Sequence, residues 1–293
     1  MKPQPTLDAN ALKSAFAALN RQNLLHMKRY PGDAFGRQPV HTVYGGAHLF
    51  KSDSAKKLGE LSLRALSRYA PDAITFSRAL GMDEVLALKV YDRVVEKLKR
   101  EAVEDFRIDF EDGYGNRPDA EEDGHAVSAA EEVAKGLADG TLPPFIGIRI
   151  KTFSNELAVR SSRTMDIFLT TLIRATKGKL PDPFYVTLPK VVHPGQAAAL
   201  HKLLNAFEKK KKLKPNTIKV ELMVEKPQSI IGFDGKAPLR AMVDALPGRC
   251  TSAHFGTYDY TASCNITAAH QRMDHLSCDF AKHVMQVTLA GTG

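Results

Sequence analysis

The stretch Phe106-Arg107-Ile108-Asp109-Phe110, followed at once by Glu111-Asp112-Gly113, indicates how this chain folds. A short, mainly apolar run long enough for one strand ends in two carboxylates and a glycine. Short apolar runs of this kind alternate along the chain with amphipathic helical patterns. Strand followed by helix, repeated, predicts a parallel sheet with right-handed crossovers. The sequence therefore predicts an α/β fold.

A chain with this alternation forms either a doubly wound sheet or a β/α barrel. It contains no Gly-x-Gly-x-x-Gly and no Gly-Lys-Ser/Thr loop, which counts against the nucleotide-binding doubly wound folds. We therefore predict a TIM-type β/α barrel over residues 41–293, preceded by an N-terminal arm over residues 1–40. The expected strands cover residues 41–44, 106–110, 145–150, 184–188, 218–224 and 252–255, and the expected helices cover residues 55–69, 82–100, 126–138, 162–177, 194–210, 238–246 and 275–289.

Composition excludes several classes of protein. The 293 residues, 43% hydrophobic and 25% charged, suit one barrel with a sizeable core. No apolar run reaches the roughly 18 residues of a membrane span, and no signal-peptide core is present. Cys250, Cys264 and Cys278 form neither a disulfide framework nor a zinc pattern. We expect a soluble, cytoplasmic protein with no membrane partner.

The net charge of +8 raises the question of a nucleic-acid partner. The densest basic run, Lys209–Lys212, closes a helical pattern, where lysines favour the helix C-terminus. No aromatic residue interleaves the run, which favours a solvated helix end over the alternative of a nucleic-acid patch. We expect no nucleic-acid partner and a modest attraction for anionic small molecules.

Charged side chains gather directly after the predicted strands. In a β/α barrel the carboxyl ends of the strands share one mouth, where the active site is built. The alternative is that charged residues end strands only because loops are hydrated. The residues concerned are Glu111, Asp112, Arg149, Lys151, Lys190, Glu225 and Asp259.

These strand ends also carry a resemblance to a known family. Asp109–Gly113 resembles the Asp-Leu-Glu-Asp motif of the citrate lyase beta-subunit-like and hydroxy-oxo-acid aldolase group, within the phosphoenolpyruvate/pyruvate superfamily of β/α barrels. Residues 148–151 resemble its Arg-Val-Asn strand, and residues 188–191 its Leu-Pro-Lys-Val. Glu225 lies where the family has Glu-Thr, and residues 256–260 resemble its Gly-x-x-Asp-Leu. The likeness runs from about His41 to Asp259.

The resemblance implies carbon–carbon cleavage through an enolate, assisted by Mg²⁺. Glu225 and Asp259 would be the metal ligands, since carboxylates suit a hard cation. Arg149 would hold the oxygen on which negative charge develops, although a plain salt bridge to Glu111 or Asp112 is the alternative. The substrate would be a small-molecule acid or a coenzyme A thioester.

Three further residues are assigned from the same motifs. Glu111 and Asp112 would orient Arg149 and metal-bound water. Lys190 would support the substrate carboxylate, or pair with a barrel carboxylate; a Schiff-base role is less favoured beside two metal-binding carboxylates.

His48, which follows Gly45-Gly46, is the candidate general base among the histidines, with a structural, hydrogen-bonded histidine as the alternative. Two of the motifs depart from the family pattern: Lys151 replaces its asparagine, and Lys226-Pro227 replaces its threonine and the neighbouring residue. The segment from Phe50 to Asp105 is also longer than one crossover helix requires. These departures leave the substrate open.

Only six strands are predicted, whereas a closed barrel has eight. We expect a sheet that stays open beside the sixth strand, followed by mainly helical residues 262–289. An open parallel edge needs covering, which favours truncation or completion by a partner and a homo-oligomer. Two other functions remain: the reverse condensation, as in malate-synthase-like chemistry, and a non-catalytic or degenerate barrel that binds a metabolite or partner.

Overall fold

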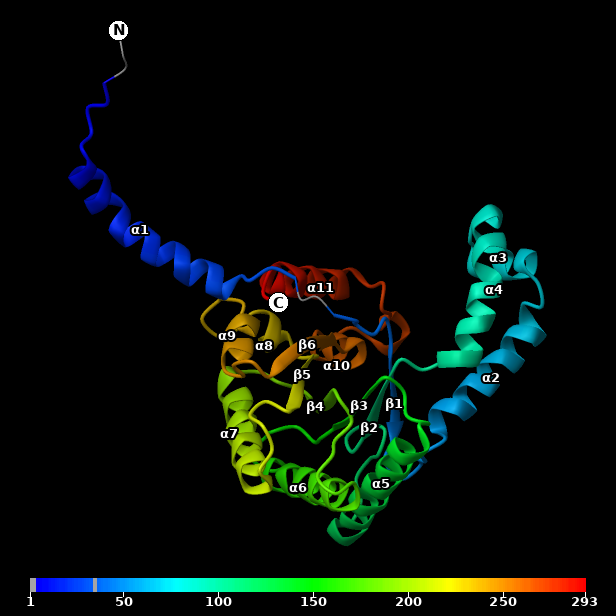
Figure 1. Cartoon of the computed structure of the whole chain (residues 1–293). Helices are drawn as coiled ribbons and strands as arrows, with labels where there is room; N and C mark the ends of the chain where they lie inside the picture. The colour runs from blue at the N-terminus through cyan, green and yellow to red at the C-terminus, as the bar shows by residue number, and fades with distance from the viewer. Residues whose placement is uncertain (1–3, 34–35) are drawn as a thin grey trace.

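A single sheet of six parallel strands lies at the centre of the molecule (Figure 1). The computed structural model describes residues 4–33 and 36–293. Each strand pairs with its neighbour in chain order, so within the described residues β1 and β6 are the two edges. The strands are β1 Thr42–Gly46, β2 Asp105–Asp109, β3 Phe145–Arg149, β4 Phe184–Leu188, β5 Ile218–Val224 and β6 Cys250–Phe255.

All six predicted strands are confirmed, with ends that differ by at most two residues. The sheet curls far enough for the Tyr44 hydroxyl on β1 to donate a hydrogen bond to Glu221 on β5, over 3.1 Å. The fold is thus an α/β, TIM-type barrel that is not closed by backbone pairing between β1 and β6 in the described residues. Strands β2, β3 and β4 are buried throughout, as parallel strands covered on both faces should be.

The helices surround the sheet or project from it. All seven predicted helices are present, but α5 begins at Asp119 rather than at Ala126, and α1, α3, α8 and α10 were not predicted. The helices are α1 Ala9–Arg29, α2 Ser54–Tyr69, α3 Ala73–Leu80, α4 Glu84–Glu101, α5 Asp119–Asp139, α6 Ala158–Ala175, α7 Pro194–Lys211, α8 Pro227–Ile230, α9 Leu239–Asp244, α10 Thr257–Ser263 and α11 Leu276–Leu289.

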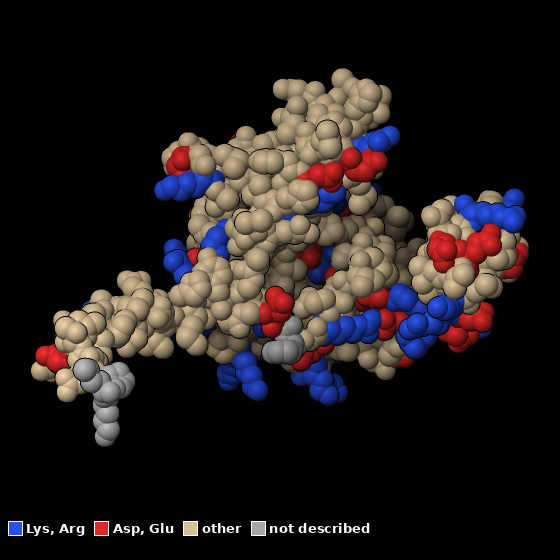
Figure 2. All heavy atoms as spheres, turned by 90° about the horizontal axis from the view of Figure 1, so that it is seen from above, with Lys and Arg blue, Asp and Glu red and all other residues tan. Residues whose placement is uncertain are grey.

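Two parts of the chain extend away from the barrel. Helix α1 has no buried residue and projects from one side, and the hairpin of α3 and α4 stands out with α2 on the other (Figure 1). Asp8 caps α1 by accepting a hydrogen bond from the backbone N–H of Ala11, and Arg240 donates to the carbonyl oxygen of Arg29 at its far end. Basic and acidic side chains are interspersed over the second projection (Figure 2). The α2–α4 segment accounts for the long stretch between the first two strands.

The two faces of the sheet differ in chemistry. On β2, Phe106 and Ile108 point outward and join the hydrophobic core beneath the helices. The alternate residues Asp105, Arg107 and Asp109 are just as buried but point into the barrel. The barrel therefore has an apolar exterior layer and a polar interior, and that interior leads up to the mouth. Among the described helices, none combines the length and apolar character that a membrane crossing needs.

Candidate active site

Three carboxylates from different strand ends meet at the mouth of the barrel. Asp112 follows β2, Glu225 follows β5, and Asp259 lies in the first turn of α10 after β6. Each offers one oxygen, and these oxygens all lie within 4.8 Å of one another. Gly256 lets the chain pass close by, because a Cβ there would lie 2.6 Å from the Cβ of Glu225. The predicted pair Glu225 and Asp259 is thus joined by Asp112 in one cluster.

The ammonium group of Lys190 sits among these carboxylates. Its Nζ lies 3.0 Å from Asp112 Oδ2 and 3.1 Å from Asp259 Oδ2, and it also donates a short hydrogen bond to Glu111. The backbone N–H of Lys190 donates to Glu225 Oε1 over 2.8 Å. Burial favours the neutral amine, but Glu111 and Asp112 outweigh it and raise the pKa of Lys190. The side chain is therefore a cation, which disfavours a Schiff-base role.

A second lysine reaches the same cluster from the position where the sequence departs from the family pattern. Lys226 Nζ lies 3.2 Å from Asp259 Oδ1 and 3.4 Å from the hydroxyl of Ser263. Glu111, Asp112, Glu225 and Asp259 therefore face two ammonium groups, those of Lys190 and Lys226. The mouth is left with an excess of two negative charges when all four carboxylates are ionised.

Arg149 lies beside the cluster and is held by Asp109. The two residues are direct partners in the register of β2 and β3. Arg149 Nε donates to Asp109 Oδ1 over 2.7 Å, and Nη2 donates to Oδ2. The remaining nitrogen, Nη1, lies 3.4 Å from Glu111 Oε2 and 3.8 Å from Asp112 Oδ2, and it donates to the sulfur of Met223 over 3.4 Å. The guanidinium is thus fixed along one edge and points its Nη1 edge at the carboxylates.

From the sequence, Glu111 and Asp112 were predicted to orient Arg149, and Asp109 was given no role beyond its place in the motif Asp109–Gly113. In the structure Asp109 is the close partner of the guanidinium, and it also accepts hydrogen bonds from the backbone N–H groups of Glu111 and Gly113, over 2.9 and 2.7 Å. One buried carboxylate thus shapes the turn after β2 and positions Arg149. The motif spacing contained a signal for this role, since Asp109 and Glu111 are one strand period apart, but the strand register did not follow from it.

Burial and the neighbouring charges shift the pKa values of groups in the mouth. Burial, with smaller contributions from Asp259 and Glu111, raises the pKa of Glu225 to about 7 against the opposing charge of Lys190. Burial also raises the pKa of Glu111. For Arg149, burial favours the neutral form, but Asp109 outweighs it and raises the pKa of the guanidinium, which stays charged.

The donor set of the cluster fits a hard divalent cation. Carboxylate oxygens are the ligands that Mg²⁺ prefers, and Asp112, with its partly exposed side chain, leaves room for water. A divalent cation would also cancel the excess of two negative charges. Of the three carboxylates, Asp112 and Asp259 now contact the ammonium groups of Lys190 and Lys226, and Glu225 accepts a hydrogen bond from the backbone N–H of Lys190.

Two other residues singled out in the sequence lie apart from this cluster. The ring of His48 packs against Tyr114 and His125, with centroids 5.6 and 6.1 Å apart, and the buried Nδ1 of His48 has no hydrogen-bond partner among the described residues. Burial lowers the pKa of His48, which favours the neutral ring. Lys151 is buried and turned away, with Nζ 3.3 Å from Glu122 and donating to the carbonyl oxygen of Phe110. Neither side chain contacts the described carboxylates of the mouth.

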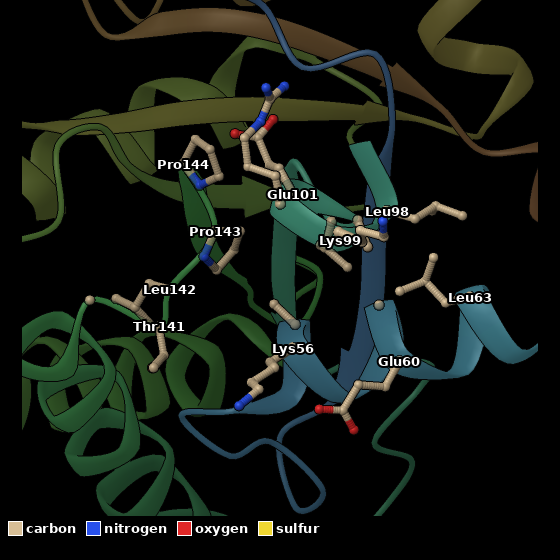
Figure 3. A pocket seen from close by; sticks show the side chains of 16 residues that line it. Lys56, Glu60, Leu63, Leu98, Lys99, Glu101, Thr141, Leu142, Pro143 and Pro144 are labelled. Atoms are coloured by element: carbon tan, nitrogen blue, oxygen red, sulfur yellow. The ribbon is translucent and has the colours of Figure 1, made fainter. Parts of the chain in front are cut away.

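A cavity of about 520 Å³ lies elsewhere, between α2, the end of α4 and the loop 140–144 (Figure 3). Lys56 and Glu60 of α2 line one side of it, and Pro143 and Pro144 line another (Figure 3). Val103 and Pro144 precede β2 and β3, so the cavity lies toward the amino ends of the strands. In TIM-type barrels chemistry is located at the opposite, carboxyl end. The mouth is therefore the candidate active site.

The fold and site together define an open β/α barrel with a carboxylate cluster and a fixed arginine at the carboxyl ends of its strands. A family model described as a domain of unknown function (DUF6986) matches residues 19–293, and the chain belongs to that family. No significant relative was found among curated proteins.

Two solved structures are similar in fold. A citrate lyase from Burkholderia xenovorans LB400 superposes with a TM-score of 0.52 at 20% identity, covering 89% of this chain and 63% of that one. A malate synthase from Haloferax volcanii, solved as a lead(II) complex, gives a TM-score of 0.53 at 16% identity, covering 89% and 61%. The chain thus spans less than two thirds of the length of either protein. These likenesses establish the barrel fold.

Proposed function

We propose that this chain acts as a carbon–carbon lyase or aldolase that depends on a divalent cation, Mg²⁺ by the chemistry of its ligands, and works through an enolate. The substrate class is a hydroxy-acyl thioester or a hydroxy-oxo acid. One observation carries the proposal: oxygens of Asp112, Glu225 and Asp259 lie within 4.8 Å of one another, beside the Nη1 edge of Arg149. The fold likeness to a citrate lyase and a malate synthase supports it.

Each residue of the mouth has a role in this reaction. The bound cation would supply Lewis-acid polarisation of the substrate's carbonyl. Arg149 donates through Nη1 to the oxygen that gains negative charge as the carbon–carbon bond breaks. Asp109 fixes the guanidinium in advance, so that this donor needs no reorganisation during the reaction. Lys190 and Lys226 attract a substrate carboxylate to the mouth. The reverse condensation passes through the same enolate and uses the same groups.

The proposal is tested by metal binding and by enolate formation. Glu225→Gln and Asp259→Asn each remove one charged ligand and leave the side-chain volume nearly unchanged, so both variants should fold but lose Mg²⁺ binding in calorimetric titration. The same variants should lose Mg²⁺-dependent exchange of the methyl protons of pyruvate with D₂O, followed by NMR. Pyruvate serves as the probe because its exchange reports enolate formation without knowledge of the natural substrate.

Asp139→Asn is the matched control, because Asp139 is a half-exposed carboxylate paired with Lys135 at the end of α5. It should bind Mg²⁺ and exchange pyruvate protons like the unmodified chain. Unchanged Mg²⁺ affinity in both site variants would remove the proposed metal site. Mg²⁺ binding without proton exchange would favour the non-catalytic alternative, a barrel that binds a metabolite.

A further inference from the structure

Below the mouth, the interior of the barrel holds a buried polar network centred on Glu221 of β5. Glu221 Oε1 accepts hydrogen bonds from the hydroxyls of Thr187 and Tyr44, over 2.9 and 3.1 Å. Its Oε2 accepts from Ser252 over 3.0 Å, and Arg107 Nε lies 3.5 Å from Oε1. Glu221 is 4% exposed, and charged groups at that depth are retained only with partners of this kind. The network joins β1, β2, β4, β5 and β6 through side chains.

Tyr44 is the point at which this network meets the candidate active site. Its hydroxyl donates to Glu221, while its ring lies 4.8 Å from the guanidinium carbon of Arg149. Asp109 fixes the same guanidinium along its Nε and Nη2 edge. Arg149 is therefore held by the Asp109 carboxylate at one edge and by the ring of Tyr44. A cation–π contact that is shielded from water, as this one is, is among the stronger interactions of its kind.

The phenol of Tyr44 is suited to such a supporting role. Burial and the charge of Glu221 raise the pKa of Tyr44, so the hydroxyl keeps its proton and remains a donor. The ring comes from β1, whereas its hydrogen-bond acceptor is on β5, so the side chain reaches across the interior. A residue tied at both ends in this way has little freedom to follow thermal motion of Arg149.

We propose that Tyr44 is a positioning residue for Arg149: its ring, anchored by the hydroxyl to Glu221, sets the direction in which the Nη1 edge faces the carboxylate cluster. The expected effect of Tyr44 on the reaction rate rests on the proposed function. The effect of Tyr44 on the orientation of Arg149 does not depend on it. Tyr44 does not act on the substrate; it acts through Arg149.

Three variants test the proposal. Tyr44→Leu removes the ring and the hydroxyl, and should lower the maximal rate of Mg²⁺-dependent pyruvate proton exchange roughly tenfold, with unchanged Mg²⁺ affinity and little change in the pyruvate KM. Tyr44→Phe keeps the ring and should retain most of the rate. Tyr185→Phe is the control, because Tyr185 is equally interior but its ring lies 4.5 Å from Arg107 instead of Arg149. It should leave the exchange rate within about twofold, even if it lowers thermal stability as much as Tyr44→Phe.

A double variant separates positioning from general loss of structure. In the Arg149→Lys background, Tyr44→Leu should cause no further loss of rate, because its effect passes through Arg149. Crystal structures supply a readout that is independent of the proposed function: the guanidinium of Arg149 should shift in Tyr44→Leu and stay in place in Tyr185→Phe. An unmoved Arg149 in Tyr44→Leu would overturn the inference, whatever the enzyme assay shows. If the unmodified chain exchanges no pyruvate protons with Mg²⁺, the proposed function fails while the crystallographic test still decides the role of Tyr44.

Discussion

Two buried arginines in this barrel each pair with a carboxylate through two nitrogens, but they differ in the acceptors that their third nitrogen faces. Arg249 Nη1 and Nη2 donate to the two oxygens of Glu208 over 2.8 and 2.7 Å, and the same nitrogens donate to Ile218 O and Asn205 Oδ1. Its Nε lies 3.4 Å from a ring nitrogen of His201. Arg249 is thus surrounded on all sides.

Arg149 differs because its pair with Asp109 uses only Nε and Nη2, while Nη1 donates to the sulfur of Met223, a weak acceptor, over 3.4 Å and lies 3.4 Å from Glu111 Oε2. The two arginines also lie at opposite ends of the barrel. Arg249 precedes β6 and joins α7 to the start of β5, whereas Arg149 ends β3 at the mouth. In such barrels the amino end supports stability and the carboxyl end supports chemistry. A saturated pair such as Arg249–Glu208 joins elements of the fold, whereas an arginine whose third nitrogen has only a weak sulfur acceptor can donate to a ligand.

The largest effect should follow from breaking the saturated pair. Arg249→Met leaves the Glu208 carboxylate buried without its main partner, and should lower the free energy of unfolding by about 3–5 kcal/mol. Urea denaturation measures it, and the Mg²⁺ affinity of the folded fraction should not change. The double variant Arg249→Met with Glu208→Leu should recover part of the loss, because no uncompensated charge remains. If Arg249→Met lowered the free energy of Mg²⁺ binding as much as the free energy of unfolding, the amino end of the barrel would not serve stability alone.

The second effect concerns the reaction rate and tests Arg149, at the carboxyl end of the barrel. Arg149→Lys keeps the charge but loses the bidentate geometry and the Nη1 donor. It should lower the rate of pyruvate proton exchange by about 10²-fold, the scale of one oxyanion donor, and should leave Mg²⁺ affinity nearly unchanged. Exchange kinetics under saturating Mg²⁺ provide the measurement. A lysine variant with near-normal rate would reduce Arg149 to a structural ion pair like Arg249.

The smallest effect is a pH dependence at the saturated pair. Burial opposes ionisation of Glu208, but hydrogen bonds from Arg249 and from the backbone N–H of Ile218 outweigh it and lower the pKa of Glu208. The stability that this contributes is fully present above the unfolded pKa of about 4.3 and is lost as the pH falls through the lower folded pKa.

The stability difference between the unmodified chain and Glu208→Gln should therefore narrow on acidification below about pH 4. Thermal denaturation followed by circular dichroism across that range measures it. A difference that stays constant with pH would show that the carboxylate charge of Glu208 contributes nothing to the pair.

The strands were predictable because burial on both faces leaves a direct trace in the sequence. Phe184–Leu188 and Ile218–Val224 are short, mainly apolar runs of the kind that buried parallel strands have, and both were located to the residue. Helix α1 was missed because it has no buried face, and a periodic pattern reports burial on one side. The short helix α3 lies between Phe50 and Asp105, a segment that was recognised only as longer than one crossover helix requires.

The candidate site was predictable only in part. Strand ends converge in any parallel barrel, so the meeting of Glu225, Asp259 and Lys190 follows from the fold alone. The partner of Arg149 depends on the register between β2 and β3, which places Asp109 directly beside it. Register follows from packing of many side chains at once, and no local spacing in the sequence encodes it. Tyr44 was absent from the sequence assignments for the same reason, since its acceptor lies on a strand far along the chain.

Because β1 and β6 do not pair in the described residues, ion pairs at the mouth link parts of the sheet that backbone hydrogen bonds do not join directly. Asp112 follows β2 and Asp259 follows β6, so backbone hydrogen bonds connect them only the long way around, through β3, β4 and β5. The ammonium group of Lys190 spans the short way, 3.0 Å from Asp112 and 3.1 Å from Asp259. Lys190 thus links the carboxyl ends of β2 and β6 through two ion pairs. A ligand that displaces Lys190 would remove this link between the carboxyl ends of β2 and β6, and a divalent cation bound to Asp112 and Asp259 would restore it with a larger charge.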